Sequence, residues 1–130
     1  MIVDSSAIIA ILLGEPGHEP LVDILADAGT VAAGGPTLAE TGMVLVGRLG
    51  ITGKTLLARF VQETELAVVP VGPEHWTVAV DAFARYGKGR HPAALNFGDC
   101  LTYAVAHVAE EPLLCVGDDF PRTDLPLVRW

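Results

Sequence analysis

The sequence contains few cysteines, few aromatic residues and few basic residues. Its 130 residues include two cysteines and 6% aromatic residues, and eight Lys and Arg stand against sixteen Asp and Glu, for a net charge of −8. The two cysteines could in principle pair in a disulfide. No C-x-x-C or H-E-x-x-H motif indicates zinc. The acidic balance argues against a domain that holds nucleic acid on a broad basic surface.

Long hydrophobic runs are also absent. No apolar run approaches the roughly 20 residues that span a bilayer, and the apolar start at Met1 lacks the basic leader of a secretory signal. We therefore expect a cytoplasmic protein with no membrane partner. Because 51% of the residues are apolar, the chain can bury one core, and we predict a single domain over 1–130. Cys100 and Cys115 lie in apolar segments, which predicts buried free thiols.

The apolar periodicity alternates between strand and helix patterns along the chain. Strands are predicted at 1–3, 31–33, 66–71, 113–116 and 127–129, and helices at 7–13, 21–28, 36–49, 56–61, 76–83 and 101–108. This order, β-α-α-β-α-α-β-α-α-β-β, favours an α/β fold with a parallel sheet covered by helices. Trp76 and Phe83 fit core positions of their helix, and Trp130 is predicted to be packed.

Four acidic residues are predicted to meet at one edge of this sheet. Asp4 and Asp118 follow apolar strands, and Glu40 and Asp99 lie in the first turns of helices, the second with Asn96 as its N-cap. Crowded carboxylates repel unless cations neutralise them, and oxygen ligands select Mg²⁺ or Mn²⁺. We expect Asp4, Asp99 and Asp118 to bind the metal directly. Glu40 is expected either to bind the metal through a water molecule or to orient the attacking water. Such a site activates water for attack on a phosphoryl group.

Each acid also has a purely structural explanation. An acid in the first turn of a helix stabilises the helix dipole, which could account for Asp99 and Glu40. Asp4 and Asp118 could be turn residues or caps, and Asp119 is close enough to take the place of Asp118.

The only basic loop runs from Arg85 to His91. Its side chains Arg85, Lys88 and Arg90 are predicted to contact the backbone of an RNA beside the acidic site. The alternative is a solvated, glycine-rich loop without a ligand.

The sequence resembles the PIN-domain nucleases, and among them the toxins of bacterial VapBC toxin–antitoxin systems. The resemblance is carried by motifs that follow the family's order over nearly the whole chain: Met1-Ile2-Val3-Asp4-Ser5-Ser6-Ala7, Leu38-Ala39-Glu40, Leu95-Asn96-Phe97-Gly98-Asp99-Cys100 and Gly117-Asp118-Asp119-Phe120 with Thr123-Asp124.

This resemblance implies a three-layer α/β/α PIN fold and a Mg²⁺- or Mn²⁺-dependent endoribonuclease that is the toxin of a type II pair. It also implies inhibition by a cognate VapB-type antitoxin and a homodimer. Asp4, Glu40, Asp99 and Asp118 match the acidic quartet of the family. The fourth acid is the least regular position in the family, so the choice between Asp118 and Asp119 stays open.

Two other functions are compatible with clustered acids. A receiver-like phosphoacceptor domain also gathers acids around magnesium, but it needs paired acids after the first strand, where this chain has Asp4-Ser5-Ser6, and a lysine after the last core strand, where no lysine follows Lys88. The second alternative is a partner-binding domain in which the acidic cluster docks a basic segment without catalysis.

Overall fold

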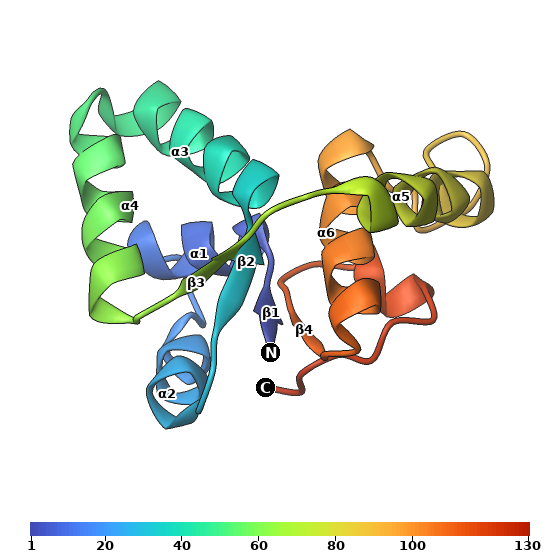
Figure 1. Ribbon diagram of the computed structural model, residues 1–130. Coiled ribbons are helices and arrows are strands. Elements are labelled where there is room, and N and C mark those ends of the chain that lie inside the picture. The colour runs from blue at the N-terminus through green and yellow to red at the C-terminus, as the bar shows by residue number, and fades with distance from the viewer.

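The computed structural model describes all 130 residues, and Figure 1 shows a central sheet with helices on both faces. The elements in chain order are β1 (Ile2–Val3), α1 (Ser5–Leu12), α2 (Glu19–Asp27), β2 (Ala32–Gly34), α3 (Gly35–Leu49), α4 (Thr52–Glu63), β3 (Ala67–Val69), α5 (Pro73–Tyr86), α6 (Phe97–Ala109), β4 (Leu113–Leu114) and a 3-10 helix (Phe120–Arg122). The predicted alternation of strands and helix pairs is confirmed up to β4.

The four strands are parallel and stand in the order β3-β2-β1-β4. β1 lies in the middle, where Ile2 pairs with Ala32 on one side and with Leu113 on the other. Because the two termini of the chain supply β1 and β4, the first and last acidic motifs come together at one edge of the sheet.

Two hydrophobic clusters cover the two faces of the sheet. Successive residues of a strand point to opposite faces, so Ile2 joins the cluster beneath α5 and α6, whereas Val3 joins the cluster beneath α1 to α4. Figure 1 shows the same division, with α1 to α4 on one side of the sheet and α5 and α6 on the other. The predicted α/β/α layering is therefore confirmed, as is the burial of both free cysteines.

Three of the four strands are shorter than predicted, β2 begins one residue later than predicted, and the predicted strand 127–129 is wrong. Leu127 forms one isolated parallel bridge with Leu113. Pro126 has no N–H to donate, so the pairing does not extend toward the preceding residues. Pro70 limits β3 in the same way, and the strand ends at Val69.

The prediction that Trp76 and Phe83 lie in the core is wrong. The side chains of Trp76 and Phe83 are 61% and 44% exposed. α5 packs through the other stripe of its surface, which carries the buried residues His75, Ala79, Ala82 and Tyr86. Both stripes have helical spacing, so periodicity alone cannot identify the buried one. Trp130 is half exposed, and its indole N–H donates to the carbonyl oxygen of Cys115 at 3.1 Å.

Candidate active site

Asp4 lies directly after β1, where it caps α1. Its side chain is 4% exposed, and Oδ2 accepts hydrogen bonds from the backbone N–H of Ser6 at 3.0 Å and from Ser6 Oγ at 2.6 Å. Ser6 Oγ in turn accepts a hydrogen bond from the backbone N–H of Val116 at 3.0 Å. Ser6 therefore joins Asp4 to the chain that leaves β4.

Glu40 lies on α3, next to the first turn of α6. Ser5 Oγ donates to Glu40 Oε1 at 2.9 Å, which fixes one oxygen of the carboxylate. The other oxygen, Oε2, is the atom that a Cβ at position 98 would strike first. Gly98 thus lets the Glu40 carboxylate approach the start of α6, one residue before Asp99.

Asp99 completes the N-terminal cap of α6. The Asp99 N–H donates to Asn96 Oδ1, and the Asn96 N–H donates to Asp99 Oδ2, each at 2.9 Å. The predicted N-cap at Asn96 is therefore confirmed. Burial raises the pKa of Asp99 to about 6 and outweighs the hydrogen bond from Asn96, which lowers it. The negative charges of Asp4, Asp119 and Glu40 raise this pKa further.

Asp118 and Asp119 are both exposed and follow Gly117, whose φ of +104° turns the chain sharply. Asp119 is the member of the pair whose charge acts on the site, because it raises the pKa of Asp99. It also contributes, after burial and Asp4, to a Cys115 thiol pKa of about 12. Asp118 is not among the charges that shift either pKa.

The donor set of this site consists of carboxylate oxygens flanked by the hydroxyl groups of Ser5 and Ser6. Hard oxygen donors fit Mg²⁺ or Mn²⁺, and a divalent cation would offset the repulsion that raises the pKa of Asp99. In the present side-chain conformations no three acidic, histidine or cysteine groups converge closely enough to hold an ion. One reason is that Asp99 Oδ2 faces the N–H of Asn96. The chemistry of the donor groups nevertheless fits a hard divalent cation.

The basic side chains of 85–91 have different surroundings. Arg85 donates to Tyr86 Oη at 2.7 Å and to Asp124 Oδ2 at 3.4 Å. Arg90 donates to the carbonyl oxygen of Ala84 at 3.3 Å. The side chain of Lys88 is exposed, and its backbone N–H donates to the carbonyl oxygen of Leu95, directly before α6. The loop thus begins beside the helix that carries Asp99, and Arg85 belongs to an intramolecular network.

Sequence analysis missed the residues that hold the acids in place. Ser5 and Ser6 follow Asp4, and Gly98 precedes Asp99. Their position next to the acids in the sequence is the one feature that could have identified them. Their roles depend on contacts with Glu40 and Val116, which lie far away along the chain.

Comparison with known proteins agrees with this fold. The family model described as PIN domain matches residues 1–125. The chain superimposes on VapC20 of Mycobacterium tuberculosis, described as a sarcin-ricin loop cleaving toxin, with a TM-score of 0.81 at 21% identity over 98% of both chains. It superimposes on the VapBC2 structure from Rickettsia felis, solved with a DNA fragment from its promoter, with a TM-score of 0.79 at 15% identity over 99% of this chain and 97% of that chain. The fold and the family match define a PIN domain.

The relationship is closer at the level of sequence. Ribonuclease VapC36 of Mycobacterium tuberculosis is 49% identical over 126 residues, which cover 96% of this chain and 91% of that protein. The chain therefore belongs to the VapC ribonucleases of the PIN-domain family.

The longest helix, α3, has 15 residues, and none of the helices combines the length and hydrophobicity needed to cross a bilayer.

Proposed function

We propose that this protein is a metal-dependent endoribonuclease and the toxin of a type II toxin–antitoxin pair. The main support is that Glu40 lies between the segments of Asp4 and Asp99, held by Ser5 and facing Gly98, in a member of a family of ribonucleases. Burial alone would explain one raised pKa, whereas the added effects of Asp4, Glu40 and Asp119 on Asp99 indicate one shared site.

Asp4, Asp99 and an acid of the pair Asp118 and Asp119 are proposed to hold Mg²⁺ or Mn²⁺, with Glu40 acting through water. A bound ion would neutralise charge on the phosphoryl group and lower the pKa of water. Glu40 would orient the attacking water with Oε2, because Ser5 already binds Oε1. Ser6 would hold Asp4 in position, since its hydroxyl group bonds both to the carboxylate and to the chain after β4.

The test is cleavage of purified cellular RNAs by the antitoxin-free protein in Mg²⁺, in Mn²⁺ and in chelator. The matched control is Asp99→Asn, because the asparagine oxygen can still accept the hydrogen bond from Asn96 while the charge is lost. We expect metal-dependent cleavage by the wild-type protein and none by the variant. Equal cleavage by both proteins would contradict the mechanism, and a folded wild-type protein that cuts no RNA would favour the partner-binding alternative.

Asp118 and Asp119 offer a paired test of the fourth acid. Asp118→Asn and Asp119→Asn remove the same charge from adjacent exposed residues. Because the charge of Asp119 reaches Asp99, we expect the second variant to lose more activity and to lower the pKa of Asp99. A larger loss in the first variant would restore Asp118 to the quartet.

The proposed protein partner is a VapB-type antitoxin with a basic segment. The net charge of −8 and the acidic site favour a basic partner, and the similar structure from Rickettsia felis is described as that of VapBC2. Copurification with a coexpressed antitoxin, and loss of RNA cleavage in that complex, would test this assignment.

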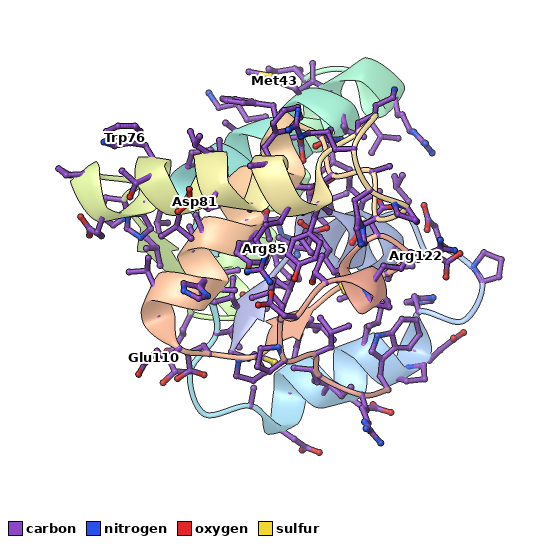
Figure 2. All side chains as sticks on the ribbon, turned by 90° about the vertical axis from the view of Figure 1, so that its right-hand side faces the viewer. Met43, Trp76, Asp81, Arg85, Glu110 and Arg122 are labelled. Carbon is purple, nitrogen blue, oxygen red and sulfur yellow. The ribbon has the colours of Figure 1, made fainter.

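We also propose a homodimer that buries the exposed stripe of α5. Trp76, Val80 and Phe83 of this stripe lie beside Phe97, which is 82% exposed. Together with three neighbouring residues they line a wholly apolar hollow of about 360 Å³. Figure 2 shows Trp76 at the outer edge of α5. Contiguous apolar surfaces of this kind are uncommon on monomers and frequent at interfaces.

A further inference from the structure

Asp124 connects the C-terminal segment to two helices on the same face of the sheet. Tyr103 Oη, on α6, donates to Asp124 Oδ1 at 2.6 Å. Arg85 Nη2, on α5, donates to Asp124 Oδ2 at 3.4 Å. Figure 2 shows Arg85 between α5 and the C-terminal segment. We refer to Arg85, Tyr103 and Asp124 as the clamp, because Arg85 and Tyr103 hold the Asp124 carboxylate by its two oxygens.

The donor side of the clamp is rigid. Tyr103 is 3% exposed, and its ring stacks on His107 at 5.8 Å and lies 6.0 Å from the ring of Tyr86. Burial raises the pKa of Tyr103, which therefore stays protonated and able to donate. The hydrogen bond from Tyr103 lowers the pKa of Asp124, so the pair unites a neutral donor with a charged acceptor.

The segment from Asp119 to Asp124 is short and internally bonded. The Arg122 N–H donates to the Asp119 carbonyl oxygen at 3.2 Å, and Thr123 Oγ1 donates to the Phe120 carbonyl oxygen at 2.7 Å. Phe120 is 2% exposed and anchors the segment in the core. Apolar burial is non-directional, however, so it holds the segment without fixing its rotation. The clamp supplies directional contacts at the other end.

We propose that Asp124 is a positioning residue for the acidic site, fixing through the clamp the segment that presents Asp119 to Asp99. This inference rests on the proposed function. The contacts of the Asp124 carboxylate are with Tyr103 and Arg85, on α6 and α5, and not with the acids of the site. Its effect passes along the chain to Asp119, in the way that residues behind a metal site orient the ligands.

Three substitutions separate the contacts of the clamp. Tyr103→Phe removes the hydroxyl donor and keeps the buried ring. Asp124→Asn keeps an oxygen acceptor for Tyr103, whereas Asp124→Ala removes every contact. The matched control is Thr64→Val, which also removes a hydroxyl group that donates at 2.7 Å, here to the carbonyl oxygen of Phe60 at the end of α4.

The first readout is the dissociation constant of Mn²⁺ alone, measured by electron paramagnetic resonance. The second is amide hydrogen exchange of residues 117–123 in chelator. We expect Tyr103→Phe to weaken Mn²⁺ binding about tenfold, as for residues that orient metal ligands, and to accelerate exchange in this segment. Asp124→Asn should bind Mn²⁺ more tightly than Asp124→Ala. In RNA cleavage, Tyr103→Phe should lower kcat and leave KM unchanged. The control Thr64→Val should match the wild-type protein in Mn²⁺ affinity and in hydrogen exchange.

A purely structural clamp would give a different pattern. Tyr103→Phe would then lower the melting temperature as Thr64→Val does and leave Mn²⁺ affinity and exchange of 117–123 unchanged, which overturns the proposal. If the wild-type protein neither binds Mn²⁺ nor cleaves RNA, the proposed function is wrong, and hydrogen exchange then tests the clamp alone. Faster exchange of 117–123 in Tyr103→Phe supports the clamp, and unchanged exchange overturns it.

Discussion

The carboxylate of Glu40 lies in the space that a Cβ at position 98 would fill. This contact joins α3 to the first turn of α6, and it makes the absence of a side chain at Gly98 a geometric requirement of the acidic site. The backbone of Gly98 has no positive φ, so its requirement for glycine comes from the close approach of Glu40 rather than from conformation.

We expect Gly98→Ala to reduce RNA cleavage by at least about tenfold, because the new methyl group displaces the Glu40 carboxylate. The matched control is Gly47→Ala on α3, where an added Cβ meets nothing within 4 Å. Gly47→Ala should raise the free energy of unfolding by about 1 kcal/mol through helix propensity and leave cleavage unchanged. Urea unfolding and initial cleavage rates measure both effects. Full activity in Gly98→Ala would show that Glu40 can move without consequence.

The raised pKa of Asp99 predicts that the stability of the metal-free protein depends on pH. Its pKa is about 6 in the folded protein against an ordinary 3.8, so the folded state binds more protons than the unfolded state between these values. The free energy of unfolding therefore falls as pH rises from about 4 to 6. Asp99→Asn should abolish this fall in the free energy of unfolding. At pH 7 the variant should be more stable than the wild-type protein by about 1 kcal/mol, a value that allows for solvent screening of the charge of a half-buried group.

Urea titrations in chelator at pH 4 and pH 7 measure this difference. The two proteins should converge at pH 4, where the wild-type carboxyl group is largely protonated in its folded state. A constant difference at both pH values would mean that Asp99 titrates normally.

The exposed side chain of Lys88 is expected to make a salt-dependent contribution to RNA binding. Each lysine that neutralises a phosphate of single-stranded RNA contributes about 0.7 to the slope of log affinity against log salt. Lys88→Ala should reduce the slope by that amount, whereas Arg59→Ala, which removes one charge from an ion pair with Glu63 on α4, should leave it unchanged. The slopes are measured from RNA binding in chelator, with Asp99→Asn added to each protein to prevent cleavage. Equal slopes for the parent, Lys88→Ala and Arg59→Ala proteins would show that the loop is solvated and does not contact RNA.

The exposed stripe of α5 predicts the oligomeric state. Val80→Ser should shift the protein from dimer to monomer in sedimentation equilibrium, because Val80 lies within the proposed apolar interface. The control is Val108→Ser, at a 38% exposed valine near the end of α6. A wild-type monomer, or a dimer that persists in Val80→Ser and in Trp76→Ser, would exclude this surface as the interface.

Local signals in the sequence predicted the fold and part of the candidate site. The N-cap at Asn96 follows from residues three apart in the chain, and the position of Asp4 follows from the end of an apolar strand. The buried stripe of α5 could not be identified, because Trp76 and Ala79 lie on two stripes that both have helical spacing. The difference lies in packing against α6, which is a tertiary contact.

The fourth acid was undetermined for a similar reason. Asp118 and Asp119 are neighbours, and the direction of each side chain depends on the turn at Gly117. The hydrogen bond between Tyr103 and Asp124 spans 21 residues and leaves no periodic pattern in the sequence. Long-range contacts of this kind become visible when the sheet has brought the segments together.

The pairing of β1 with β4 also determines when the proposed site can form. Asp4 and Glu40 are synthesised before Asp119 and before the partner strand Leu113–Leu114. A nascent chain can fold its N-terminal helices first, but it lacks the edge of the sheet where the acids meet. The acidic site therefore cannot be complete before the segment from Leu113 to Asp119 has been synthesised and has paired with β1.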